Sequence, residues 1–358
     1  MIRLRIKQRE GEKMIRCNND YSRGAHPAIL KALEEINETS FGGYGTDEIC
    51  ETARKDIAKY LDCPNAEIHF VVGGTQANVL MIEAALTRKY HGVICANSGH
   101  INVHESGSIE NTGHKLLALP AVDGKLSAEQ IADEAEAFRS SPLQEHICEP
   151  KAVYISFPTE YGTIYSKKEL REIRAVCDEY KLHLIIDGAR MSYGLASERN
   201  DLTLADICDM ADIFYIGGTK CGLLFGEAVV ITNDEIKVGF RNYMKLYGAL
   251  LAKGWLLGLQ FHVMFADGLY FDIAKDAVEY AEIIKYECLK KGLAPYVVSD
   301  TNQLFYVMSK EMIAKLEEDF FFEVMDPVDN KYNIIRFCTS WSTTREEAEA
   351  LADAISML

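Results

Sequence analysis

The sequence predicts an α/β protein with a mainly parallel sheet, helices on both faces and a smaller C-terminal α/β domain. The chain has 358 residues, which is more than one ordinary hydrophobic core holds. Up to about residue 235, short apolar runs alternate with amphipathic helical stretches, a rhythm typical of a parallel sheet covered on both faces. Beyond that point two long helical stretches lead to short strands and a last helix. We therefore expect two domains, with a boundary near residue 270.

The first part of the chain contains seven runs that predict strands. Most are short and rich in apolar or β-branched residues, as buried strands are. These runs cover residues 68–72, 93–96, 115–119, 152–156, 182–186, 213–216 and 228–231. Between them, helices are expected at 75–90, from Ser127 onward and at 167–180. The sequence thus predicts a seven-stranded sheet.

The second part predicts two long helices and a small sheet. Helices are expected at 245–265, 270–293 and 343–356, and strands at 295–298, 303–307 and 332–338. At the other end of the chain, residues 1–45 have little strand signal, and Gly and Tyr are frequent around 41–46. We expect that segment to contribute to a site or an interface. The predicted division is an N-terminal segment at 1–45, a large domain at 46–270 and a small domain at 271–358.

Composition limits the classes of partner. With 38 basic and 54 acidic residues the net charge is −16, so we expect neither nucleic acid nor anionic membranes as partners. The ten cysteines form no C-x-x-C pair and no His cluster accompanies them, so we expect reduced, mostly buried thiols and no metal site. The first ten residues lack the apolar core of a signal peptide, and no membrane-spanning apolar run occurs. We therefore expect a cytoplasmic protein.

The segment from Gly73 to Asn78 follows a predicted strand and opens a helix. Glycine lets the backbone come close to a ligand, and the free amides of a first helical turn attract anions such as phosphate. Taken alone, the motif is more typical of a plain tight turn with an N-cap.

Two further residues follow predicted strands. Asp187 comes directly after Leu184-Ile185-Ile186, at the strand end where ligands of open α/β sheets bind, and an acid there can pair with a protonated ring nitrogen. Lys220 follows Gly217-Gly218-Thr219 among small and apolar neighbours, and a desolvated Lys has the lowered pKa of a Schiff-base nucleophile. Each also has another explanation, an Asp that caps a turn and a surface Lys in a glycine loop. A phosphate-binding segment, an acid and a Lys nevertheless occur in the order expected of one site, each at the end of a predicted strand. We therefore predict that they share a site.

Together these segments resemble the threonine aldolase branch of the β-eliminating lyase superfamily, whose fold is aspartate-aminotransferase-like (type I). The resemblance covers nearly the whole chain, and the Asp-Gly-Ala-Arg box with a downstream Lys is its most specific part. The matching segments are Gly74-Thr75-Gln76-Ala77-Asn78, Asp187-Gly188-Ala189-Arg190 and Thr219-Lys220, with further likeness at 43–47 and 19–22.

The resemblance implies that pyridoxal 5′-phosphate is the cofactor. It would be held as a Schiff base on Lys220, with Asp187 keeping the pyridine nitrogen protonated so that the ring serves as an electron sink. His100 would lie on the face of the ring, although a His after a strand is also commonly a surface or core residue. The implied cofactor-binding residues are Gly74, Thr75, Gln76, His100, Asp187, Arg190, Thr219 and Lys220.

The implied substrate-binding residues come from three parts of the chain. Arg336 lies in an apolar strand and would bind the substrate carboxylate, although a structural ion pair would also explain a cation there. Arg190 would reach either this carboxylate or the phenolic oxygen of the cofactor. Tyr21 and Ser22 belong to the segment that resembles the family's N-terminal substrate strand.

The sequence departs from the family in two places. Glu160 falls where typical threonine aldolases have a His near the substrate hydroxyl, so the base for the hydroxyl proton is expected to be Glu160 or His100. His114, in the earlier stretch from Glu110 to His114, precedes a different strand, so it is not expected to take the place of the family's His. The family's glycine-rich segment is altered at 247–254, and either Lys245 just before it or Lys253 within it would supply the cation that this segment gives to a neighbouring subunit's phosphate.

The expected activity is cleavage of a β-hydroxy-α-amino acid such as L-threonine or L-allo-threonine to glycine and an aldehyde. The catalytic residues would be Lys220, His100, Asp187 and Glu160. Two alternatives remain open: another pyridoxal-phosphate-dependent lyase that eliminates a β-substituent, and a non-catalytic α/β ligand-binding protein. In this fold type the site lies between subunits, so a homodimer or homotetramer with shared sites is expected.

Overall fold

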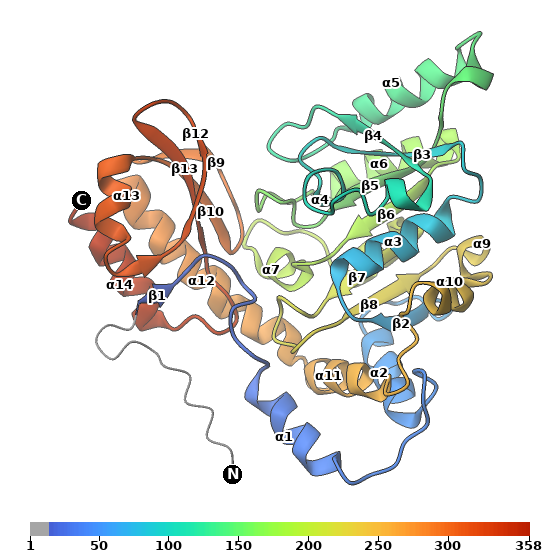
Figure 1. Ribbon diagram of the computed structural model, residues 1–358, viewed down its shortest axis with the longest axis horizontal. Helices are drawn as coiled ribbons and strands as arrows, with labels where there is room; N and C mark the ends of the chain where they lie inside the picture. The colour runs from blue at the N-terminus through green and yellow to red at the C-terminus, as the bar shows by residue number, and fades with distance from the viewer. Residues whose placement is uncertain (1–13) are drawn as a thin grey trace.

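The computed structural model describes residues 14–358 and is built around a seven-stranded sheet (Figure 1). The strand order is β2-β8-β7-β6-β5-β3-β4, and β8 runs antiparallel to both of its neighbours while the other strands are parallel. The strands are β2 (Glu67–Val71), β3 (His91–Ala96), β4 (Lys115–Leu119), β5 (Glu149–Ser156), β6 (His183–Asp187), β7 (Ile213–Gly217) and β8 (Glu227–Ile231). This confirms the predicted α/β fold with its mainly parallel sheet.

The inner strands are apolar on both faces because helices cover both faces. Every residue of β3, β7 and β8 is buried, and alternate side chains enter two different core clusters. Ile94 and Ile186, for example, face one cluster, whereas Val93 and Ile185 face the other. The first cluster is completed by α1 (Pro27–Ile36), α2 (Glu48–Ala58), α5 (Ala128–Arg139), α6 (Lys167–Tyr180), α8 (Leu204–Met210) and α11 (Trp255–Phe265), and the second by α3 (Gly74–Ala85), α9 (Asp234–Lys237) and α10 (Phe240–Leu246).

A second, four-stranded antiparallel sheet has the order β12-β13-β10-β9 and packs with the C-terminal helices. The short strand β1 (Ile15–Arg16) comes from the other end of the chain and pairs with β11 (Phe320–Phe321) beside this sheet. The remaining elements here are β9 (Ala294–Val297), β10 (Gln303–Ser309), β12 (Glu323–Pro327), β13 (Tyr332–Cys338), α13 (Lys310–Leu316) and α14 (Arg345–Ser356).

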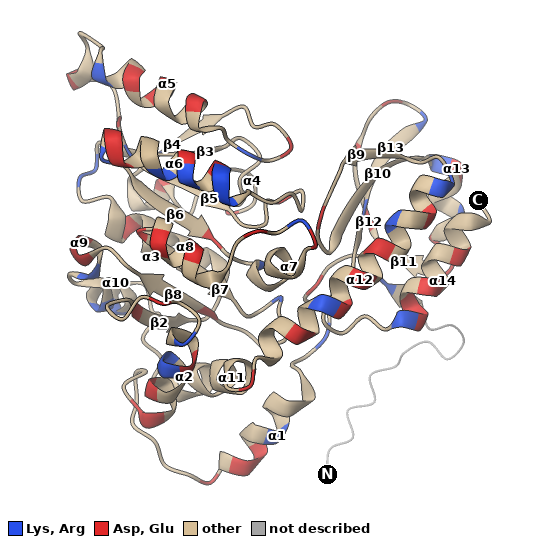
Figure 2. Cartoon of the chain, turned by 180° about the vertical axis from the view of Figure 1, so that it is seen from behind, with Lys and Arg blue, Asp and Glu red and all other residues tan. Residues whose placement is uncertain are grey.

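The helix α12 (Leu269–Lys290) joins the two sheets (Figure 1). Its buried residues up to Val278 belong to the core of the large sheet, whereas those from Ala281 onward belong to the core of the small sheet. Seen from behind, the acidic and basic residues lie mainly on the outer helices and sparsely on the central strands (Figure 2). No helix within residues 14–358 is long and apolar enough to cross a membrane.

Three element predictions need correction. The helix expected at 245–265 is broken, because α10 ends at Leu246, Gly248 adopts a positive φ of 71° and α11 begins only at Trp255. The helix expected to reach residue 90 ends at Ala85, where Leu86 becomes extended. The sequence interpretation also missed α1 and α2 in and beside the N-terminal segment. Of the predicted segment 1–45, the first 13 residues lie outside the described residues.

Candidate active site

A cavity of about 1040 Å³ lies at the edge of the large sheet where the parallel strands end. Residues of the small sheet, among them Gln303, Phe305 and Arg336, form another part of its wall. Of the residues expected from the sequence, the cavity lining includes Tyr21, Gly74, Thr75, His100, Glu160, Asp187, Arg190, Thr219, Lys220 and Arg336. Gln76 and Ser22 are not part of it: the Gln76 side chain bonds Val72 N and Tyr247 O, and the exposed Ser22 hydroxyl donates to Asn19.

Asp187, the last residue of β6, is a buried carboxylate with several donors. Its Oδ1 accepts from the Tyr215 hydroxyl at 2.6 Å and from Ala189 N at 2.8 Å, and its Oδ2 accepts from the Tyr154 hydroxyl and from Asn78 Nδ2. Burial alone would raise the pKa of Asp187, but hydrogen bonds from Tyr154 and Tyr215 outweigh it and hold this pKa below its usual range. The site therefore keeps a fixed negative charge at the strand end.

Lys220 lies in the loop between β7 and β8 and is half-buried. Its backbone is held by the Tyr193 hydroxyl, which donates to Lys220 O at 2.7 Å, whereas its Nζ has no hydrogen bond or ion pair within residues 14–358. Desolvation, followed by the nearby charge of Arg190, lowers the pKa of Lys220. Gly188, just after β6, allows the close approach of β7, since a Cβ there would lie 1.9 Å from Tyr215 O. The amine is thus positioned and its deprotonated form is favoured, as a Schiff-base nucleophile requires.

The N-terminus of α3 opens into the same cavity. Gly73 caps this helix without any side-chain hydrogen bond, and Gly73, Gly74 and Thr75 all line the cavity. The first amides of a helix have no partner within the helix, so they can bind an anion. A Cβ at Gly74 would lie 3.0 Å from the Tyr215 hydroxyl, which shows how closely the backbone approaches the Asp187 network.

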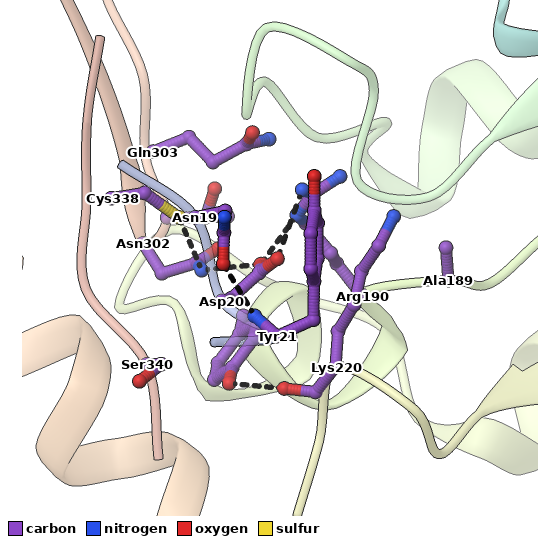
Figure 3. Close-up of polar contacts among 12 residues, drawn as sticks. Asn19, Asp20, Tyr21, Ala189, Arg190, Lys220, Asn302, Gln303, Cys338 and Ser340 are labelled. Atoms are coloured by element: carbon purple, nitrogen blue, oxygen red, sulfur yellow. Dashed lines mark hydrogen bonds and ion pairs between the residues drawn. The ribbon is translucent and has the colours of Figure 1, made fainter. Parts of the chain in front are cut away.

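Arg190 is paired with Asp20, which the sequence interpretation did not single out (Figure 3). Its Nε lies 2.6 Å and its Nη2 3.1 Å from the Asp20 carboxylate, which also accepts from Asn302 at 3.0 Å. Nη1 is the guanidinium nitrogen without a partner in the described part of the chain. In Figure 3 the Tyr21 ring stands beside Arg190 and Lys220. Arg190 is therefore oriented by a buried carboxylate and keeps one nitrogen for a ligand.

Arg336 on β13 reaches the cavity from the small sheet. It forms an ion pair with Glu323 and donates to Gln303 Oε1 at 3.2 Å and Asn18 O at 3.0 Å. The structural ion pair that the sequence left open is thus present. Glu323 is 46% exposed, so a ligand carboxylate would compete with a partner that water already reaches.

His100 and Glu160 lie together at the ends of β3 and β5. Glu160 Oε1 accepts from the backbone N of His100 at 2.8 Å and from Ser156 Oγ at 2.7 Å. Burial raises the pKa of Glu160. His114, by contrast, lies outside the cavity lining and contacts His91 O through Nδ1 at 3.2 Å.

Sequence reasoning missed two further acids, Glu105 and Glu227. Glu227 lines the cavity at the start of β8 and accepts from Gly218 N at 2.7 Å, and burial raises its pKa to about 7. The sequence did offer a signal for Glu227, because it is a charged residue at the start of an otherwise apolar strand. Glu105 contacts the ring of His100 at 2.7 Å. Its signal was weaker, because its partners come from distant parts of the sequence.

Comparison with known proteins now decides the family. The model of the β-eliminating lyase family matches residues 26–314. The chain belongs to the β-eliminating lyase family. Among its relatives, a low-specificity L-threonine aldolase of Pseudomonas aeruginosa is 29% identical over 96% of this chain and 97% of that protein.

Solved structures place this β-eliminating lyase in its threonine aldolase branch. The threonine aldolase of Leishmania major is 43% identical, with a TM-score of 0.93 over 96% of this chain and 98% of that one. The aspartate aminotransferase of Thermus thermophilus, at 12% identity and a TM-score of 0.71 over 98% of this chain and 92% of that one, shares the fold. The predicted family and aspartate-aminotransferase-like fold are confirmed.

The family and fold are those of pyridoxal-phosphate-dependent enzymes, and the cavity fits this cofactor. It combines the free Nζ of Lys220, the ionised Asp187 and the open N-terminus of α3 at one sheet edge. These are the groups that a carbonyl, a pyridine nitrogen and a phosphate each require. The protein is thus a pyridoxal-phosphate-dependent lyase.

Proposed function

We propose that this lyase cleaves β-hydroxy-α-amino acids of the threonine and allo-threonine type to glycine and an aldehyde. The names of its relatives support this, as does one observation in the cavity. A free lysine amine, a carboxylate held ionised, two arginines and a half-buried carboxyl with a raised pKa all face one space. An amino group, a carboxylate and a hydroxyl of one small substrate can be bound there at the same time.

Pyridoxal phosphate, when bound, supplies an electron sink for the electrons of the broken Cα–Cβ bond. Lys220 would hold the cofactor, Asp187 would hold a proton on its pyridine nitrogen, and Gly74 and Thr75 would bind its phosphate together with the Thr219 hydroxyl. His100 would cover the ring face. These roles rest on the shared cavity and on the pKa directions of Lys220 and Asp187.

The substrate carboxylate would bind Nη1 of Arg190 and the guanidinium of Arg336, with Tyr21 alongside. Glu160 would take the proton of the β-hydroxyl group, with His100 as the other candidate base. The raised pKa of Glu160 supports this role, because a base works best when its pKa approaches the working pH.

We further propose a cytoplasmic homodimer or homotetramer with sites shared between subunits. All ten cysteines are free, as in a reducing compartment. The proposed domain division at residue 270 puts α12 with the small domain. Residues of both sheets line the cavity, which supports a role for both domains in the site.

The experiment uses purified protein loaded with pyridoxal phosphate. L-Threonine and L-allo-threonine are added separately, and glycine, acetaldehyde, 2-oxo acid and ammonia are all assayed. We expect glycine and acetaldehyde in equal amounts, with the preferred substrate revealing the stereochemical preference at Cβ. Lys220→Ala is expected to abolish both products.

A 2-oxo acid and ammonia in place of glycine would reject the aldolase assignment in favour of an eliminating lyase. A protein that binds the cofactor and neither substrate would likewise contradict it. Lys168→Ala serves as a matched control, because it removes an exposed Lys of α6 outside the cavity lining and should leave cofactor attachment to Lys220 intact.

A further inference from the structure

Glu105 is a fully buried carboxylate at the end of the turn that follows His100, and the mechanism above does not use it. Its side chain has no exposed surface. Oε1 accepts from Asn78 Nδ2 at 2.8 Å and contacts Nδ1 of His100 at 2.7 Å, while Oε2 accepts from Ser108 Oγ at 2.7 Å. A buried carboxylate is tolerated when donors surround it, and three donors do so here.

This arrangement determines where the His100 proton lies. An amide nitrogen can only donate, so Oε1 is an acceptor toward Asn78; because a carboxylate oxygen carries no proton to donate, its 2.7 Å contact with His100 requires a proton on Nδ1. In the neutral ring the lone pair is consequently on Nε2. Nε2 has no hydrogen-bond partner within residues 14–358, and the ring lines the cavity with 34% of the side chain exposed.

Asn78 extends the network to the other side of the site. Its Nδ2 donates to Glu105 Oε1 and also to Asp187 Oδ2 at 3.2 Å, so its two amide hydrogens link two buried carboxylates. The amide thereby offsets the repulsion between two acids that would otherwise favour protonating one of them. Asn78 belongs to the Gly74–Asn78 motif of α3, so one turn of helix carries both the anion-binding amides and this link.

We propose that Glu105 is a positioning residue that fixes His100 as the Nδ1-protonated tautomer, and that Asn78 ties this constraint to Asp187. His100 then presents an acceptor, Nε2, to the ligand. A proton accepted there creates an imidazolium ion beside Glu105, which stabilises it. The role of Nε2 toward the reacting amino acid rests on the proposed function, whereas the assignment of the tautomer does not.

The test is the tautomer of His100, measured by long-range proton–nitrogen NMR on protein with ¹⁵N-labelled histidine, with and without pyridoxal phosphate. The chain has nine histidines, and the His100 signal is identified by its absence in H100A. We expect wild-type His100 to carry its proton on Nδ1 at neutral pH. Glu105→Gln keeps an acceptor oxygen and should preserve this tautomer, whereas Glu105→Leu should convert His100 to the Nε2-protonated form.

His114 is the matched internal reference, because its Nδ1 contacts a backbone carbonyl and not Glu105. Its signal should be the same in wild type, E105Q and E105L. A wild-type His100 protonated on Nε2 would overturn the proposal without any variant, so the test stands even where E105L fails to fold. An unchanged His100 signal in folded E105L would overturn it too.

Turnover gives the second readout. With L-threonine, we expect E105L to lower kcat by about 10²-fold while KM changes by less than about 3-fold, and E105Q to recover most of kcat. A purely structural role would instead raise KM and weaken cofactor binding in E105L, with no rescue by E105Q. Were the wild type to release no glycine, the proposed function would fail while the tautomer result remained valid.

Discussion

Glu160 shows how one side chain can be set for proton transfer by its surroundings. It is half-buried beside Ser156 and the backbone of His100, and desolvation raises its pKa above the ordinary value of 4.5. A base must be ionised to accept a proton, so a raised pKa brings its working range closer to neutral pH. The cost is that activity is lost at a higher pH than with an ordinary Glu.

This leads to a prediction about the pH profile. In wild type, kcat/KM for L-threonine should fall on the acid side as the pH drops through the raised pKa of Glu160. In Glu160→Gln that acid limb should vanish and kcat should fall by about 10²-fold, because the neutral amide cannot accept the proton. Rates measured from about pH 4 to about pH 9 check this. An acid limb that persists unchanged in E160Q would assign the base to His100 instead.

Individual residues of the site show what the sequence could predict and what it could not. Lys220, Asp187 and the Gly74–Thr75 turn were recognisable because each follows an apolar strand, and the topology brings the ends of parallel strands to one edge. Asp20 and Glu105 were not, because neither follows a strand. Their meaning lies in partners such as Arg190 and His100, which only folding brings within hydrogen-bond distance.

The contact of α11 with α2 depends on a glycine. A Cβ at Gly258 would lie 2.6 Å from Cys50 Sγ and 2.8 Å from Cys50 Cα. Helices that pack this closely need a small residue at the contact, since added atoms force the backbones apart. A related constraint lies just before α11, because a Cβ at Gly254 would lie 2.6 Å from Gly45 N. The spacing of apolar residues in the sequence does not indicate either of these close contacts.

We therefore expect Gly258→Ala to destabilise the protein by about 1–3 kcal/mol, despite the better helix propensity of Ala. Urea denaturation followed by circular dichroism measures this. Gly24→Ala is the control, because nothing lies within 4 Å of a Cβ there and its midpoint should stay close to wild type. Equal midpoints for the two variants would show that α11 and α2 can separate without cost.

The cavity between the two sheets has a volume of about 1040 Å³, which is more than one amino acid fills. A neighbouring subunit that supplies part of the wall would reduce this space, as the proposed homodimer or homotetramer implies. Lys245 near the end of α10 and Lys253 on the altered segment 247–254 are both exposed, and Lys245 lies over the Tyr44 ring. They are the candidates for a cation given to the neighbouring site.

Shared sites predict complementation between inactive variants. As homo-oligomers, Lys220→Ala should be inactive and the double variant K245A/K253A only weakly active. Mixed by unfolding and refolding together, they should regain about a quarter of wild-type activity, because half of the random dimers then contain one intact site of two. Light scattering, read against the chain mass of 40.2 kDa, verifies the assembly. Stable dimers without regained activity would show that each chain supplies its own cation.

The continuous helix α12 has a mechanical consequence. Its 22 residues make a rod of about 33 Å that is anchored in the large core at one end and in the small core at the other. Pivoting this rod by about 5° would carry its far end through about 3 Å, roughly the length of one hydrogen bond. Arg336 lies on β13, whose neighbouring residues Ile335 and Phe337 share a core with that end, so it would be displaced with it. A lever of this kind can convert a slight repacking around α7 (Met191–Ala196), next to Arg190, into the making or breaking of a contact across the cavity.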